Sequence, residues 1–168
     1  MCELACEQNN LPAAAEHLQR SQELGEHMGL PQHPYRWRVA MARIKAAQGD
    51  LDGALQLLKE AEQRYVGDFF PNVRPVTALV IRVWVVQGRV AQALGWAREQ
   101  GLSAGDELAY LREFEHITLA RILIARAKID ASSHSLREAI GLLARLLEAA
   151  EAGERIGRVI EILVLQAL

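Results

Sequence analysis

Three arginines recur at a constant interval along the chain, and they are the side chains best suited to bind a ligand. Arg43, Arg82 and Arg121 are separated by 39 residues and again by 39, and each lies six residues before the position of a recurring turn glycine. Because this period returns each arginine to the same phase of its helix, we expect the three to share one groove, where their guanidinium groups would bind a carboxylate or a phosphate bidentately. The alternative is that each arginine bridges neighbouring helices by pairing with an acid or a carbonyl group, which is the commoner role of charged residues in repeat arrays.

Trp84 lies two residues after Arg82 and is the fourth candidate for this binding site. An indole beside an arginine can stack on a ring or a sugar of a ligand. The alternative is packing in the core, which is the commoner role of tryptophan and which we also expect for Trp37 and Trp96.

Residues 101–105 read Gly-Leu-Ser-Ala-Gly and match the Gly-x-Ser-x-Gly pattern of a nucleophile elbow. That motif works only where a strand-to-helix turn pushes the serine out of a sheet, and the preceding segment, residues 90–100, has the pattern of a helix. We therefore interpret Ser103 as a helix-capping or linker residue and not as the nucleophile of a hydrolase.

No grouping of residues in the sequence predicts a metal site or a catalytic centre. The five histidines include no His-x-x-x-His pair, no Cys-x-x-Cys occurs, and we interpret Cys2 and Cys6 as small buried thiols. Glu113, Glu115 and His116 form a cluster without a second converging group, so we interpret it as a solvated or inter-repeat polar contact. We expect no catalytic residue, no metal and no enzymatic activity.

Composition limits the class of protein. Of the 168 residues, 51% are hydrophobic but only 5% are aromatic, which favours packed helices over a β-sandwich. The net charge of −2 gives no basic footprint for nucleic acid, and the longest apolar run is far shorter than the about 20 residues that span a bilayer. Only two cysteines and no N-terminal signal segment are present, so we expect a cytoplasmic protein.

An internal repeat organises the chain. The segment GDLDGAL (residues 49–55) recurs as GRVAQAL (residues 88–94), residues 9–15 and 127–130 fit the same frame, and an insertion at residues 131–135 follows the last of these. Each unit is predicted as two helices around a tight turn, because glycine adopts the left-handed backbone at a helix end and Asp50 can cap the next helix.

The predicted helices after the first unit are residues 34–48, 51–65, 71–87, 90–100, 111–129, 136–152 and 154–168. Residues 76–86 are rich in valine and isoleucine and are also compatible with a buried strand. We prefer a helix, because the repeat places this segment at the same phase as two clearer helices and supplies no partner strand.

The turn pattern Gly-Asp-Leu-x-x-Ala-Leu, with Ala42 and Ala46 before it and Leu58 and Ala61 after it, resembles a tetratricopeptide repeat with an extended period. Residues 110–125, joined by residues 143–151 and 160–168, resemble the repeat region of the large ATP-binding LuxR-type transcriptional regulators, the maltose-regulon activator (MalT-like) family. The resemblance spans nearly the whole chain and is looser before Gln48.

The resemblance implies an all-α fold in which antiparallel helix pairs stack in a right-handed tetratricopeptide-like solenoid whose concave groove would hold the candidate arginines. We expect one array over residues 1–168, a fragment of a longer chain, with units at about 1–30, 31–70, 71–105, 106–153 and an incomplete 154–168. Full-length members carry a P-loop ATPase and a helix-turn-helix. No Gly-x-x-x-x-Gly-Lys-Ser/Thr occurs here, so this segment needs no cofactor and ATP is expected only in the absent ATPase domain.

The implied function is a non-enzymatic effector-sensing or protein-interaction module of a bacterial LuxR-type regulator, and the alternative is a general tetratricopeptide protein–protein scaffold. Its partners would be an unknown small-molecule effector, a protein or peptide, and the other domains of the same regulator, without direct contact to nucleic acid or membrane. We also expect self-association, through Ile162, Leu163, Leu165 and Leu168 exposed at an uncapped end.

Overall fold

The computed structural model describes residues 8, 10–28, 31–65, 71–131 and 133–168, and all regular structure in these segments is helical. The elements are α2 (Leu11–Met28), α3 (His33–Ala47), α4 (Leu51–Gln63), α5 (Val76–Val86), α6 (Val90–Glu99), the short 3-10 helix η1 (Tyr110–Arg112), α7 (Glu113–Asp130), α8 (Ser133–Ala152) and α9 (Ile156–Gln166). No strand occurs in the described segments, so the all-α prediction is confirmed and the strand alternative for residues 76–86 is wrong. No helix in these segments is both long and apolar enough to cross a bilayer.

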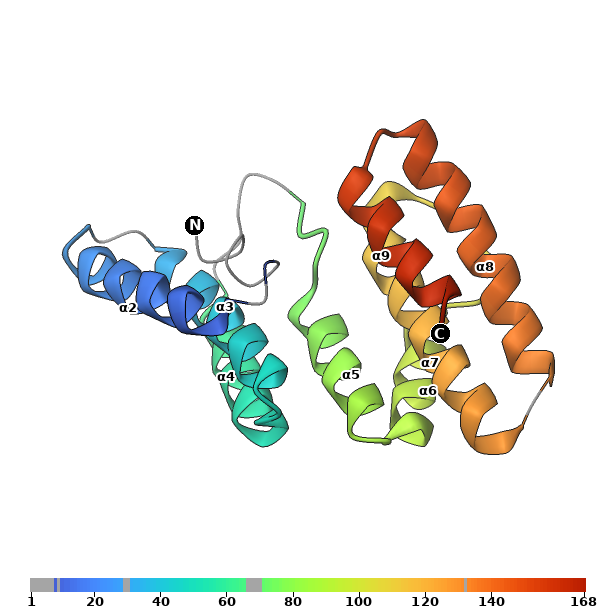
Figure 1. Ribbon diagram of the computed structural model, residues 1–168, viewed down its shortest axis with the longest axis horizontal. Coiled ribbons are helices and arrows are strands. Elements are labelled where there is room, and N and C mark those ends of the chain that lie inside the picture. Colours follow the sequence, from blue (N-terminus) through green and yellow to red (C-terminus); the bar gives the residue numbers. More distant parts are fainter. Residues whose placement is uncertain (1–7, 9, 29–30, 66–70, 132) are drawn as a thin grey trace. The chain divides into compact units, whose positions relative to one another are not determined.

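The chain divides into two compact units, residues 1–70 and 71–168. In the first unit α3 packs against α2 and α4 (Figure 1). Its small core contains Ala14, Leu18 and Ile44, with Trp37 packed against it. The indole Nε1 of Trp37 donates a hydrogen bond to the Leu18 carbonyl oxygen at 3.1 Å, so this tryptophan joins α3 to α2, which agrees with the packing role expected for it.

The second unit is built around α7, which packs against α5, α6 and α8, while α9 packs against α8 (Figure 1). Buried side chains occur at almost every position from Glu113 to Ile124, and a helix that is buried on all sides lies at the centre of its unit. Trp96 of α6 is part of the same core, as expected. Alanines with no exposed surface, at 78, 93, 120, 139 and 150, let these helices approach closely.

Glycine turns join the paired helices. Gly49 and Gly88 follow α3 and α5 with φ of +84° and +76°, the left-handed conformation predicted for them. The Asp50 carboxylate accepts a hydrogen bond from the Gly53 backbone N–H at 2.9 Å and caps α4. After α7 the left-handed position belongs to Ala131 instead, with φ of +48°.

Some predicted helix boundaries shift. Helix α5 begins at Val76 rather than at residue 71, because Pro75 has an extended backbone. Helix α8 begins at Ser133 rather than at residue 136, so part of the predicted insertion adds almost a turn to this helix, and Ser135 is buried there.

We predict that Gly88→Ala lowers the free energy of unfolding by about 1–2 kcal/mol, because alanine at a left-handed position brings its Cβ close to a carbonyl oxygen. Gly95, in the interior of α6, is the matched control, since a Cβ added there meets no atom within 4 Å. Gly95→Ala should instead raise the free energy of unfolding by about 0.5–1 kcal/mol. Urea unfolding of both variants measures the difference, and equal effects at the two sites would contradict the assigned turn.

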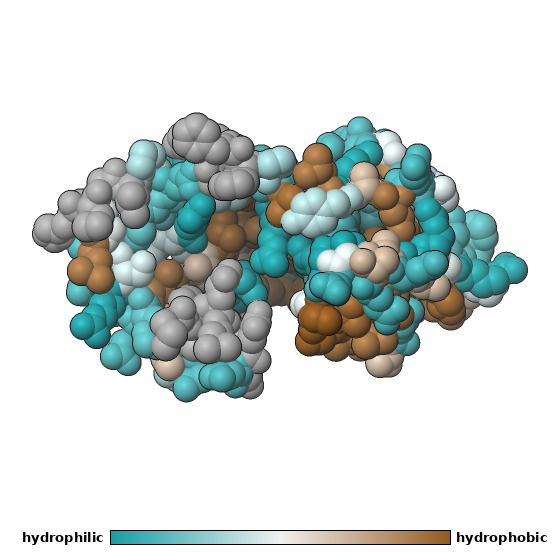
Figure 2. All heavy atoms as spheres, turned by 90° about the horizontal axis from the view of Figure 1, so that it is seen from above, coloured by the Kyte–Doolittle hydropathy of each residue, from teal (hydrophilic) through white to brown (hydrophobic). Residues whose placement is uncertain are grey.

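The apolar C-terminal helix presents a different face from the one predicted. Ile162 and Leu165 are buried, so the expectation that they are exposed is wrong, while Leu163 and Leu168 are 48% and 68% exposed. Each residue turns a helix by about 100°, so positions 162 and 165 share the face that packs on the rest of the unit and position 163 faces away from it. Figure 2 shows hydrophobic side chains exposed on this unit among hydrophilic ones. Self-association stays a prediction, and Leu163 and Leu168 are the residues available for it.

Candidate functional site

Two of the predicted arginines converge on one carboxylate. Arg82 of α5 donates from Nη1 to Oε1 of Glu161 at 2.6 Å, and Arg121 of α7 donates from Nη2 to the same oxygen at 3.0 Å. Glu161 lies on α9. The 39-residue spacing therefore brings Arg82 and Arg121 together in the second unit, and their common partner joins α9 to both helices.

Sequence reasoning missed Glu161, although the signal was present. Glu161 follows Arg121 by 40 residues, so it lies one residue beyond the next position of the 39-residue series and carries the opposite charge. The strict 39-residue period points to Ile160, so Glu161 is found only when a shift of one residue is allowed and acidic residues are considered beside arginines.

Arg82 is held from every side of its guanidinium group. Nε donates to the Thr118 hydroxyl at 2.9 Å, and Nη2 donates to the Phe114 carbonyl oxygen at 3.4 Å. The guanidinium carbon also lies 3.6 Å from the centre of the Phe114 ring, a cation–π distance. Because all three nitrogens have partners, Arg82 braces α5 against α7 and α9.

A second carboxylate continues the cluster. Arg158 of α9 donates from Nη1 to Oε2 of Glu161 at 2.9 Å, and its Nε lies 3.4 Å from Oε2 of Glu113. Arg155 donates from Nε to Oε1 of Glu113 at 2.9 Å. The interpretation of Glu113 as an inter-repeat polar contact agrees with this geometry.

We call this set the arginine–glutamate network, and its members are Arg82, Arg121, Arg155, Arg158, Glu113 and Glu161. The network contains four guanidinium groups and two carboxylates, so its positive charges exceed its negative charges by two.

The charges of the network are mutually dependent. Burial alone would raise the pKa of Glu161, but the positive charges of Arg82, Arg121 and Arg158, with the hydrogen bond from Arg121, outweigh it and lower this pKa to about 2. Burial is the main cause that lowers the pKa of Arg82 to about 10, and repulsion by Arg121 and Arg158 adds to it, while Glu161 acts in the opposite direction. Both groups are therefore charged at neutral pH.

Arg121 differs from Arg82 in its surroundings. Its side chain is 33% exposed, the largest value for an arginine of the network, and its buried Nε has no hydrogen-bond partner among the described residues. Of the two arginines on α5 and α7, Arg121 is thus the more accessible one.

The other two candidates have different surroundings. Arg43 belongs to α3 of the first unit, where its side chain is exposed. Trp84 is half-buried on α5 and packs against the core of the second unit. The guanidinium carbon of Arg89 lies 4.4 Å from the centre of its ring. A ligand contact for either residue stays a prediction.

Ser103 follows α6 and lies in a loop of turns, so it lacks the strand-to-helix setting of a nucleophile elbow. Its hydroxyl accepts a hydrogen bond from the Gly105 N–H at 3.2 Å. The Ser103 N–H donates to Asp106, and this hydrogen bond is the main cause that lowers the pKa of Asp106.

His116 is buried and connects the same loop to α7. Its Nδ1 lies 3.0 Å from the Arg112 carbonyl oxygen, and its Nε2 lies 3.2 Å from Oδ2 of Asp106. Arg145 of α8 donates to the carbonyl oxygens of Ala104 and Asp106. These contacts fix the loop against α7 and α8. No cluster of three potential metal ligands occurs in the described part of the chain.

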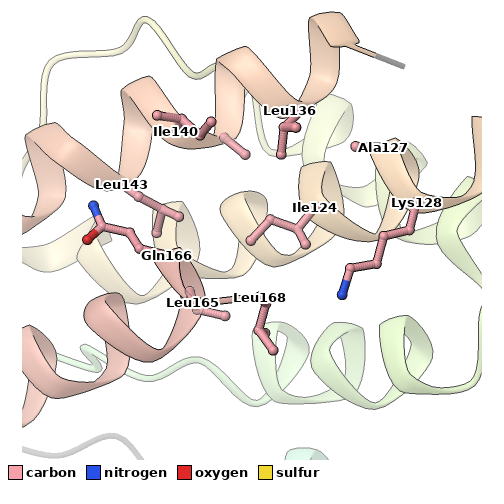
Figure 3. Close-up of a pocket in the computed structure, with 10 residues that line it drawn as sticks. Ile124, Ala127, Lys128, Leu136, Ile140, Leu143, Leu165, Gln166 and Leu168 are labelled. Atoms are coloured by element: carbon pink, nitrogen blue, oxygen red, sulfur yellow. The ribbon is translucent and has the colours of Figure 1, made fainter. Parts of the chain in front are cut away.

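A cavity of about 260 Å³ lies between α7, α8 and α9 (Figure 3). Its walls are mostly apolar side chains, including Ile124, Leu143 and Leu165, and Lys128 and Gln166 are its polar members. None of the arginines in the network lines it, so the cavity and the cationic cluster are separate features of the second unit.

Comparison with known families bears on the whole chain. The model of the MalT-like TPR region, where TPR stands for tetratricopeptide repeat, matches residues 1–168. Comparison with curated proteins and with solved structures gave no match. On the full-length family match, this chain belongs to the family of MalT-like TPR regions.

Proposed function

We propose that this chain is the effector-sensing module of a bacterial LuxR-type transcriptional regulator, and that it acts in the cytoplasm without catalysis or a cofactor of its own. The observation that carries the proposal is the convergence of Arg82 and Arg121, from successive repeats, on a single carboxylate oxygen. A site shared by successive repeats is sensitive to how the repeats stack. The family match to a helical repeat module supports the same role.

The physical mechanism is a shift of populations. A ligand that binds one arrangement of the stacked helices more tightly than another stabilises that arrangement, by no more than the difference in its two affinities. The changed stacking would then alter contacts with the other domains of the regulator, which carry ATP binding and DNA recognition. The candidate ligand contacts are Arg43, Arg82, Arg121 and Trp84.

A general protein–protein scaffold is the second candidate function. The observation that favours it is the apolar surface beside the cavity, where Ile140 and Leu168 are exposed at the edge and can accept an amphipathic helix. A scaffold would bind peptides and show no preference for small charged molecules.

A thermal-shift screen of the chain against small metabolites and amphipathic helical peptides separates the two functions. For the sensor we expect a metabolite to stabilise the wild-type chain, by about 2.7 kcal/mol at a concentration 100 times its dissociation constant. The increase should be lost in Arg121→Ala and kept in Arg126→Ala, which removes an exposed arginine of the same helix that pairs with Asp130. Stabilisation by peptides alone would favour the scaffold, and an unchanged increase in Arg121→Ala would place the ligand elsewhere.

A further inference from the structure

We propose that Glu161 occupies an anion site formed by Arg82, Arg121 and Arg158, and that a compact dianion, such as a phosphate group or a small dicarboxylate, displaces it. The inference rests on the proposed sensing function, for which it names the class of ligand and the internal group that the ligand replaces. Glu161 then acts as a built-in substitute for the ligand in the unliganded chain.

The hydrogen-bond geometry is that of an occupied anion site. Oε1 of Glu161 accepts hydrogen bonds from Arg82 at 2.6 Å and from Arg121 at 3.0 Å, and Oε2 accepts one from Arg158 at 2.9 Å. Three guanidinium groups from three helices thus share the two oxygens of one carboxylate. A phosphate group offers three terminal oxygens, one for each arginine, and guanidinium groups match both phosphate and carboxylate in shape.

The charge count favours a ligand with more negative charge than Glu161. Glu161 supplies one negative charge to three guanidinium groups. Glu113, the other carboxylate of the network, already contacts Arg155 and Arg158. Since neither carboxylate supplies further charge, positive charge remains in a partly buried region, where solvent screens it less than at the open surface. A dianion balances one charge more than Glu161 does, whereas a monoanion gains nothing by the exchange.

Arg121 provides the point of entry. It is the most exposed arginine of the network. Its Nε is buried and has no partner among the described residues, so it is a donor that a ligand can use only after entry. Arg82 and Arg158 are less exposed and have more of their nitrogens occupied. A ligand therefore meets Arg121 first and the other two arginines only as Glu161 leaves.

Displacement has a cost that sets the affinity. Glu161 is tethered to the site, and a tethered partner competes at an effective concentration on the order of millimolar or higher. Only a ligand with better charge and shape complementarity than a carboxylate overcomes this competition. Removing the charge of Glu161 should therefore tighten the binding of the ligand, although it weakens the protein.

The exchange would change how α9 is joined to the rest of the second unit. Ile162 and Leu165 keep this helix packed in the core, but Glu161 is its link to Arg82 on α5 and to Arg121 on α7. Because Arg158 lies on α9, a dianion bound to all three arginines joins this helix to α5 and α7 in place of Glu161, so local opening of α9 should become less frequent.

The experiment uses calorimetric titration of the full chain with inorganic phosphate and with malonate at constant ionic strength, and acetate is the monoanionic control. We expect saturable binding of phosphate or malonate, at least tenfold tighter binding in Glu161→Gln, and at least tenfold weaker binding of acetate. Arg121→Ala should abolish the binding, and Glu148→Gln, an exposed position of α8, should leave it unchanged. The two dianions distinguish a phosphate ligand from a dicarboxylate ligand. Should Glu161→Gln fold poorly, Glu161→Asp replaces it, since a shorter carboxylate competes less well.

Hydrogen exchange of the α9 amides in the wild-type chain, with and without the dianion, provides the second readout, and we expect slower exchange when the dianion is bound. If neither dianion bound to the wild-type chain or to any variant, the inference would be overturned. The sensing function would still be tested separately by the metabolite screen. Equal affinity in wild type and Glu161→Gln, or unchanged exchange in α9 at saturation, would show that Glu161 is not displaced.

Discussion

Replacing Glu161 with alanine is expected to lower the free energy of unfolding by about 3 kcal/mol, because removal of one partner from a buried charge pair leaves the others uncompensated. The change removes the carboxylate that pairs with Arg82 and that Arg121 and Arg158 share. The value is at the lower end of the range for buried pairs, since the Glu161 side chain keeps 18% of its surface exposed. Urea unfolding followed by circular dichroism measures it.

Glu148→Ala is the matched control for this substitution. Glu148 is an exposed glutamate in the neighbouring helix α8, so its loss should change the free energy of unfolding by less than about 0.5 kcal/mol. If the two variants were equally stable, the network would not contribute to the packing of α9.

The second large effect is expected in the core of the second unit. Ile122→Ala should lower the free energy of unfolding by about 2–5 kcal/mol, because the side chain has no exposed surface and its loss leaves a cavity in the central helix α7. Ile129→Ala, about two turns further along the same face of α7, removes the same atoms from a side chain that is 64% exposed.

The exposed isoleucine should be replaceable with a change below about 0.5 kcal/mol. Equal destabilisation at positions 122 and 129 would contradict the central place of α7, and both values come from the same unfolding measurement.

Much of the fold could be predicted from local sequence signals. Gly49 and Gly88 mark turns because glycine alone enters the left-handed region at little cost, and α4 and α6 begin within two residues of them. The start of α8 was harder to predict, because Ala131 takes the left-handed position without the sequence signal of a glycine.

The candidate site was only partly predictable, because a period places residues at one helix phase and does not state what they contact. The spacing of Arg82 and Arg121 correctly suggested that they are neighbours. Their common partner depends on a long-range contact with α9, where Glu161 lies one residue beyond the periodic position and carries the opposite charge. The orientation of Ile162 and Leu165 was missed for a related reason: an apolar run without polar interruptions gives little information about which face of the helix is buried.

The bridge between Arg82 and Glu161 also has a consequence for the order of folding. It joins residues 79 apart in the sequence, whereas each glycine turn joins helices that are neighbours in the chain. Contacts between distant residues require closure of a long loop before they stabilise anything, so the helix pairs are expected to form first and the bridge to close late. An interaction that is absent from the transition state slows unfolding and leaves the rate of folding almost unchanged. On this basis we expect the bridge to slow the unfolding of the second unit and to have little effect on the rate at which this unit folds.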